Sequence, residues 1–389
     1  MSKNLFNKII IIFSTLFYMG STIAADFKLQ FPLSCEYGQD CFVQNYVDMD
    51  DHEAVSDNPT AKHYFDYNCG FLSYDKHSGT DIRLKDFTAM ENGVDVLAAA
   101  DGVIYKVVND NDTAFNAYDG LAIDPNKACG NQVQIKHTLG DETYFTQYCH
   151  MKKASIPFDA IDPGKNRKGP EIKKGTKLGQ IGMTGHTVFP HLHIGVVKKS
   201  KDGFTNIDPF TNVSQYLMSP SNGFVNIRKL NSDNDYCANK PNVSNSLWDS
   251  SDDNVKKMME YDTYSTALLN FHVTGNPKFL DMSVDEKANI ARKGTAFRED
   301  ELAADSRYLF LWADLMGIKK ADKITFKVTN DKGDEVFNNS SDAPGNKVQY
   351  FVFMGKKMLP AGEYSASASL FRNNQVIIDN QQQNFTIKG

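Results

Sequence analysis

Long hydrophobic runs are scarce in this 389-residue sequence. The apolar segment from Ile9 to Tyr18 is too short to span a bilayer, and no later stretch approaches the roughly 20 apolar residues that a membrane helix needs. An excess of positive charge is also missing, because the formal net charge is −6. Such a chain has no general attraction for anionic polymers, so no nucleic-acid partner is expected. The short apolar runs likewise predict no membrane span.

The N-terminal apolar segment has charged and small residues on its two sides. Lys3 and Lys8 precede it and Thr22 to Ala25 follows it, which is the layout of a secretory signal peptide over residues 1–25. No cysteine stands at the expected cleavage point, which argues against a lipid anchor. The mature chain is expected to begin at Asp26 and to be periplasmic or secreted.

Cysteine is sparse, with six residues that are expected to pair in an oxidising compartment. Strands over residues 131–137 and 142–150 would form a hairpin turning at 138–141, and this hairpin places Cys129 almost opposite Cys149. A disulfide between these two is therefore predicted. The other four cysteines allow more than one connectivity, of which a small loop closed by the first two is one option: Cys35, Cys41, Cys69 and Cys237.

Helical periodicity is almost absent, and the predicted fold is mainly β. Residues 76–225 contain short β runs broken by glycine, which predicts an antiparallel β-sheet domain. Short strands separated by turns over residues 265–389 predict an immunoglobulin-like β-sandwich domain. The aromatic, Asp-rich residues 26–75 are expected to form an N-terminal extension that packs on the first domain. The polar residues 226–264 are expected to connect the two domains.

Two short segments carry side chains of the kinds that bind a catalytic zinc ion. One runs from His77 to Asp81, and the other holds His191 and His193, whose i, i+2 spacing places both on one face of a strand. Zinc enzymes usually use three protein ligands, so the natural trio is His77, Asp81 and one histidine of the pair. Taken alone, the first segment is more often a solvated loop pair, and the second is as often a satisfied strand pair.

A third segment strengthens the metal-site interpretation. Tyr144 to His150 has aromatic and β-branched strand character and ends in a histidine. Its period-two alternation predicts that Tyr148 and His150 lie on the same side of the strand. Later in the chain Thr184-Gly185 is followed shortly by Pro190 to His193.

In this order the three segments resemble the lysostaphin-type zinc metallopeptidases, over about residues 77 to 209. The resemblance implies one zinc ion per chain, held by His77, Asp81 and His193. It also implies that His150 and His191 are catalytic, as general base and as oxyanion stabiliser or proton donor, in an order that the sequence leaves open. The implied activity is hydrolysis of peptide cross-links in peptidoglycan during cell-wall remodelling.

Several positions depart from the family pattern. His186, Val188 and Phe189 stand where small residues are common, and Gly195 stands where an acidic residue is common. The substrate cleft is therefore expected to be reshaped. Residues 109–130 are expected to form a loop over or beside the site. In some relatives an N-terminal extension blocks the metal, and this sequence leaves that point open.

Two other functions compete with wall hydrolysis. Members of this family can lose ligands and act as non-catalytic modules that activate other wall hydrolases, but all five polar positions are present here. A secreted protease acting on proteins is the second alternative. The C-terminal domain is expected either to stabilise the chain or to dock an envelope protein partner.

Overall fold

The computed structural model describes most of the chain beyond the expected signal peptide, which itself lies outside the described residues. Within the described part, no helix is both long and apolar enough to cross a membrane. The described residues are 27–50, 64–109, 114–115 (backbone only), 127–165, 169–201, 203–219, 223–226, 236–238, 240, 242–293 and 297–389.

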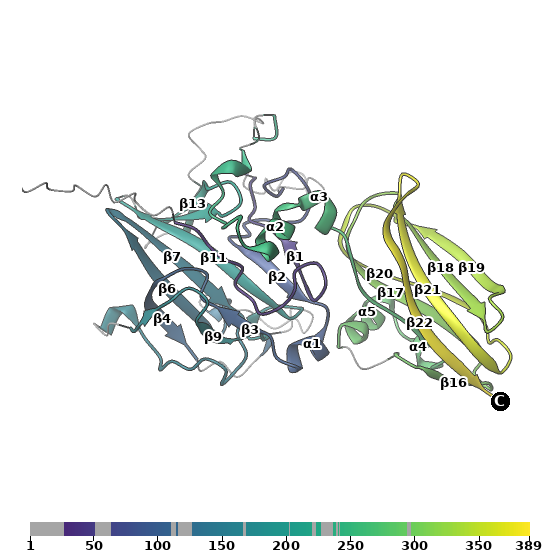
Figure 1. Ribbon diagram of the computed structural model, residues 1–389. Coiled ribbons are helices and arrows are strands. Elements are labelled where there is room, and N and C mark those ends of the chain that lie inside the picture. Colours follow the sequence, from purple (N-terminus) through teal and green to yellow (C-terminus); the bar gives the residue numbers. More distant parts are fainter. Residues whose placement is uncertain are drawn as a thin grey trace, which may run out of the picture.

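A ten-stranded antiparallel sheet forms the first region (Figure 1). Its central strand is β11 (His191–Ser200), which pairs on one edge with β7 (Glu142–Cys149). The other edge of β11 pairs first with β2 (Thr80–Leu84) and then with β12 (Gly203–Asp208). β1 (Cys41–Asn45) pairs with the outer edge of β2, so the N-terminal segment adds a strand to the sheet.

The remaining elements of this region are short. β3 pairs with β9 and β5 with β10 in two small sheets. The elements are α1 (Phe87–Glu91), β3 (Asp95–Leu97), β4 (Gly102–Val108), β5 (Ala114–Phe115), β6 (Gln132–Leu139), η3 (Pro163–Lys165), β8 (Glu171–Ile172), β9 (Lys177–Gln180), β10 (Gly185–His186), β13 (Val213–Ser219), β14 (Gly223–Asn226), η5 (Val243–Asn245), α2 (Asp253–Met259) and α3 (Tyr261–Tyr264).

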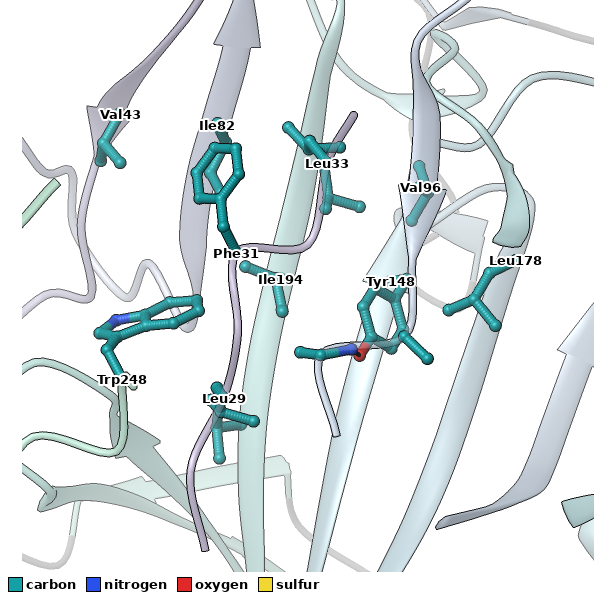
Figure 2. Packing of buried hydrophobic residues seen from close by; sticks show 14 of the residues in the cluster. Leu29, Phe31, Leu33, Val43, Ile82, Val96, Tyr148, Leu178, Ile194 and Trp248 are labelled. Carbon is teal, nitrogen blue, oxygen red and sulfur yellow. Dashed lines mark hydrogen bonds between the residues drawn. The ribbon is translucent and has the colours of Figure 1, made fainter. Parts of the chain in front are cut away.

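One face of the large sheet is buried against the N-terminal segment. Ile82, Tyr148 and Ile194 point from β2, β7 and β11 into a core that also receives Leu29 and Trp248 (Figure 2). Because neighbouring side chains of a strand point to opposite faces, the residues flanking Ile82 and Ile194 lie on the other face. The core therefore fixes which face of β2 and β11 carries the candidate site.

The β6–β7 hairpin is tighter than predicted. Leu139 pairs with Glu142, so the turn consists only of Gly140 and Asp141, and the predicted turn over residues 138–141 was wrong. Gly140 has a φ of 57°, a conformation that glycine adopts without a steric penalty. The paired parts of β6 and β7 therefore continue up to a two-residue hairpin loop.

Three disulfides join all six cysteines. Cys129 is bonded to Cys149 at the end of β7, and Cys35 is bonded to Cys41. The third bond joins Cys69 to Cys237 across a sequence separation of 168 residues. It ties the segment after β14 to the N-terminal segment.

The C-terminal region consists of two facing sheets with a shared apolar core. One sheet has the order β15-β17-β20, and the other has the order β16-β22-β21-β18-β19 (Figure 1). The elements are β15 (Ala267–Thr274), α4 (Lys278–Asp281), α5 (Val284–Lys293), β16 (Glu301–Ala303), β17 (Tyr308–Ile318), β18 (Lys323–Asn330), β19 (Glu335–Asp342), β20 (Lys347–Lys357), β21 (Gly362–Arg372) and β22 (Gln375–Lys388).

The prediction of a mainly β protein with an antiparallel sheet followed by a separate β region is confirmed. The short helices α2 and α3 were not expected in the polar connector. Their buried residues Val255, Met258 and Tyr261 join the core of the first region. The domain boundaries drawn from the sequence stay predictions.

Candidate metal centre

Two paired strands and the turn before one of them deliver the candidate ligands. Asp81 on β2 lies directly opposite His193 on β11 in the antiparallel register. His77 precedes β2, and the turn that follows it returns its ring to Asp81. His77 and Asp81 are each 2 % exposed, and His193 is partly buried.

The donor atoms of these residues form a small triangle. Asp81 Oδ1 lies 3.1 Å from His77 Nε2 and 2.9 Å from His193 Nδ1. The two ring nitrogens are 3.2 Å apart. A tetrahedral zinc site with bonds of about 2.1 Å has ligand atoms about 3.4 Å apart, so a zinc ion fits this donor set with small shifts. Among the described residues, this is the one group of three such side chains that can share an ion.

The surroundings orient two of the donors. His77 Nδ1 lies 2.7 Å from the Tyr46 carbonyl oxygen, which requires Nδ1–H to donate and leaves Nε2 as the acceptor facing Asp81. Such an outer hydrogen bond fixes the tautomer of a metal-binding histidine. Burial would raise the pKa of the Asp81 carboxyl, but the nearby imidazoles hold this pKa well below its ordinary value. Asp81 is therefore ionised, as a metal ligand must be.

His150 and His191 lie beside the triangle and outside it. Their ring centroids are 4.5 Å apart. His150 Nδ1 donates to the Thr184 carbonyl oxygen at 2.8 Å, and His191 Nδ1 donates to the Phe189 carbonyl oxygen at 2.9 Å. Each histidine thus keeps its Nε2 free for chemistry, and His191 Nε2 lies 3.5 Å from Asp81 Oδ1.

Both rings are buried, which affects their charge. Burial, reinforced by the imidazoles of His191 and His193, lowers the pKa of His150 well below its ordinary value. Burial also lowers the pKa of His191, although Asp81 opposes this shift. Both imidazoles are therefore neutral at neutral pH, which is the state that can accept a proton.

The orientation of His150 differs from the strand alternation that the sequence suggested. Tyr148 pairs with Ile194 and faces the core, whereas His150 faces His191 on the opposite side of the sheet. The reason is that β7 ends at Cys149 and His150 has a φ of +62°. A left-handed conformation is uncommon for a histidine and turns its side chain away from the strand's alternation.

The backbone at His150 is held by its neighbours. His150 N–H donates to the carbonyl oxygen of Cys129 at 2.8 Å, and Cys129 is disulfide-bonded to the preceding Cys149. Met151 N–H donates to the carbonyl oxygen of Asn131 at 3.1 Å. These contacts fix the one residue of the site that has an unfavourable backbone conformation.

Replacing Cys129 and Cys149 together with alanine is expected to lower turnover as well as stability. The free energy of unfolding should fall by about 3 kcal/mol, the usual effect of opening a loop of this size. Denaturant unfolding and steady-state kinetics measure the two effects. Replacing Cys35 and Cys41 is the matched control, and it should cost stability while leaving kcat unchanged. An equal loss of kcat in both double variants would contradict a local role for the first disulfide.

Several residues of the site carried no signal in the sequence. The ring of Tyr74, which is 49 % exposed, stacks on His77 with centroids 4.3 Å apart. Thr187 Oγ1 donates to the Phe189 carbonyl oxygen at 2.7 Å, beside the bond from His191. Both contacts are local in sequence, but they depend on backbone angles that the residue pattern does not encode. Part of the predicted loop over 109–130 lies outside the described residues, but its strand β5 pairs with β10 next to Thr184.

Gly79 lies against the ring of His193. A Cβ atom at this position would lie 2.5 Å from His193 Nε2 and 2.8 Å from the Ile194 carbonyl oxygen. We therefore expect Gly79→Ala to displace the ring and to weaken zinc binding by about ten- to 100-fold, the effect of losing support for a ligand. Competition with a chelating dye measures this affinity.

The control for Gly79 is Gly195. A Cβ atom there has its nearest neighbour, the Ser78 carbonyl oxygen, at 3.8 Å, so Gly195→Ala should bind zinc like the unchanged protein. Unchanged affinity in Gly79→Ala would show that His193 does not need this close contact.

Comparison with known proteins assigns the first region to a family. Residues 75–209 match the sequence profile of Peptidase family M23. These residues form a peptidase family M23 domain. The resemblance to lysostaphin-type metallopeptidases is thereby confirmed. The three converging side chains all lie within the matched segment.

The M23 domain aligns with two curated proteins of Vibrio cholerae. It is 27% identical over 125 residues to "Peptidoglycan DD-endopeptidase ShyA" and 28% identical over 117 residues to "Peptidoglycan DD-endopeptidase ShyC". These alignments cover 32% and 30% of this chain, but only 21% and 19% of the relatives. The matched segment therefore spans about a fifth of the length of either relative.

Among solved structures, the catalytic domain of the antimicrobial peptidase lysostaphin from Staphylococcus simulans matches at 21% identity with a TM-score of 0.20. The match covers 32% of this chain and 69% of that chain.

Proposed function

We propose that this protein is a zinc-dependent endopeptidase that hydrolyses peptide cross-links of bacterial peptidoglycan. The observation that carries the proposal is the buried triangle of His77 Nε2, Asp81 Oδ1 and His193 Nδ1, with two neutral histidines beside it. The M23 domain and the names of its Vibrio relatives support the substrate class. The names of these relatives also support a scissile bond between two D-configured residues.

His77, Asp81 and His193 would hold one zinc ion per chain. A zinc ion bound there supplies a Lewis acid that polarises a peptide carbonyl and lowers the pKa of water. The protein's part is to present two imidazoles and one carboxylate in a fixed arrangement. The hydrogen bond from His77 to the Tyr46 carbonyl oxygen and the cross-strand position of His193 provide this rigidity.

His150 and His191 would move and hold protons. In this assignment His150 Nε2 takes the proton of the attacking water and returns it to the leaving amine nitrogen. His191 Nδ1 already donates to the Phe189 carbonyl oxygen, so His191 Nε2 would donate to the oxygen that becomes negative in the transition state only as the imidazolium, the form that the nearby Asp81 carboxylate favours. Both rings are held through Nδ1 by backbone carbonyls, so neither needs to reorient during the reaction.

The three disulfides support an extracytoplasmic location. Disulfides persist in oxidising compartments such as the periplasm and the cell exterior. Together with the signal peptide expected over residues 1–25, they support a location in the compartment that holds peptidoglycan.

One experiment separates the proposal from its two alternatives. Residues 26–389 are purified, zinc is quantified, and the release of soluble peptides from purified peptidoglycan is followed with and without a chelator. The proposal expects one zinc per chain and release that stops with the chelator. A non-catalytic activator would release no peptide at any zinc content, and a secreted protease would digest casein while leaving the wall intact.

A further inference from the structure

A fully buried arginine lies on the same face of the sheet as the candidate site. Arg83 on β2 is 0 % exposed. It follows Asp81 by two positions and lies directly opposite His191 on β11. Positions i and i+2, and residues directly opposite in an antiparallel pair, share a face of the sheet. Arg83 therefore belongs to the face that carries Asp81, His191 and His193, not to the core face.

The strand beside Arg83 packs against the C-terminal region. On β1, Phe42 lies directly opposite Arg83 and packs in one buried cluster with Ala267, Leu269 and Met316 of the C-terminal region. At the same junction, Arg298 Nη2 donates to Asp86 Oδ2 at 2.6 Å. α1 and α5 also contact each other here, and Figure 1 shows α5 on the side of the C-terminal region that faces α1.

The charge of Arg83 is balanced from across this junction. Burial lowers the pKa of Arg83 to about 10, and the carboxylate of Asp314 on β17 opposes this shift. Asp314 is itself 0 % exposed, and burial raises its pKa against the effect of Arg83 and of Arg292 on α5. The groups within hydrogen-bonding distance of the guanidinium are neutral: the Gln44 side chain and the carbonyl oxygens of Leu84 and Lys85.

On its other side the guanidinium contacts the segment that holds His191. Arg83 Cζ lies 4.9 Å from the centroid of the Phe189 ring, in cation–π geometry. The Phe189 ring lies 4.4 Å from the His191 ring at an interplanar angle of 33°, and its carbonyl oxygen accepts the Nδ1–H of His191. Leu84 N–H also donates to the Pro190 carbonyl oxygen at 3.0 Å.

We propose that Arg83 is a positioning residue for His191, acting through Phe189, and that the C-terminal region completes the active site by packing against the strand beside Arg83. This inference rests on the proposed function. With the guanidinium fixed from both sides, Phe189 keeps one position, and the hydrogen bond from His191 Nδ1 keeps Nε2 directed at the candidate metal site. The C-terminal region thus contributes to turnover without supplying a residue to the cleft.

The test separates positioning from simple loss of stability. In the full mature chain, Arg83→Met removes one of the two arginines whose charge favours the buried Asp314 carboxylate, so the thermal midpoint should fall. Adding Asp314→Asn removes the second charge, and the double variant should recover most of the midpoint. Positioning by Arg83 predicts that the double variant binds one zinc but keeps a kcat lower by about tenfold or more, because a small misplacement of a catalytic group has effects of this order. KM should change by less than about twofold.

Arg298→Met provides the matched control. It removes a partly buried arginine of the junction whose hydrogen bonds go to Asp86 and Asn270, and should lower the midpoint without lowering kcat. Equal losses of kcat in Arg298→Met and in the double variant would assign the effect to a loosened junction and overturn the role of Arg83. A kcat equal to that of the unchanged protein in the double variant would overturn it as well.

Two further measurements keep the inference testable if the double variant does not fold or the protein releases no peptide. Phe189→Leu leaves the junction charges intact and should show the same loss of kcat, with the midpoint lowered only by the loss of buried ring contacts. The His191 Nδ1–H resonance, assigned by its disappearance in His191→Ala, should exchange slowly in the unchanged protein and rapidly in Phe189→Leu. Absence of peptide release would reject the proposed function alone, whereas slow exchange in Phe189→Leu would reject the positioning.

Discussion

Replacing His150 with alanine is expected to lower kcat by about 10²- to 10⁴-fold while leaving one zinc per chain, because this is the usual contribution of a general acid–base group. The ring of His150 lies outside the donor triangle and is held through the Thr184 carbonyl oxygen. Its removal therefore takes away a proton carrier and leaves all three donors in place. Steady-state release of peptides and metal analysis on the same sample measure both quantities.

His186 offers the control for this substitution. It is an exposed histidine on β10, close in sequence to Thr184. His186→Ala should keep both zinc and turnover. Loss of zinc in His150→Ala would mean that this histidine is a ligand, and the division of the site into ligands and proton carriers would then be wrong.

Replacing His193 with alanine is expected to abolish both metal binding and activity. The substitution leaves only His77 and Asp81, and two protein ligands fall short of the three that a catalytic zinc site normally has. Zinc should raise the unfolding temperature of the unchanged protein, since a ligand bound at about 100 times its Kd stabilises by about 2.7 kcal/mol. The variant should show no such increase.

His191→Ala is the matched control for His193→Ala, because the two histidines lie on the same strand face two positions apart. It should keep the zinc-dependent increase in unfolding temperature and lose turnover. A zinc-dependent increase in His193→Ala, or its absence in His191→Ala, would exchange the roles of the two residues.

Patterns of short range carried most of the information in the sequence. The alternation of His191 and His193 with Leu192 and Ile194 implies a strand with one polar and one apolar face, and β11 has such faces. The glycine-broken β runs likewise indicated an antiparallel sheet, which is confirmed. Within His77 to Asp81, the spacing suited a turn that returns to one point. The three side chains do lie together, while their role as ligands stays a prediction.

Features that depend on distant contacts or on single backbone angles were not readable. His150 leaves the alternation of β7 because of its positive φ, which no periodicity encodes. Arg83 resembles an ordinary charged strand residue, and its burial depends on contacts with Gln44 and Phe189, which lie far from it in the sequence. Phe189 was marked as a departure from the family pattern, but its contacts with Arg83 and His191 required the fold.

The most direct test of the metal centre is a crystal structure of the zinc-loaded protein with anomalous diffraction data collected at the zinc absorption edge. We expect one peak within about 2.0–2.2 Å of His77 Nε2, Asp81 Oδ1 and His193 Nδ1, with His150 and His191 beyond bonding distance. A peak bound by another set of side chains, or no peak between these three donors, would contradict the account.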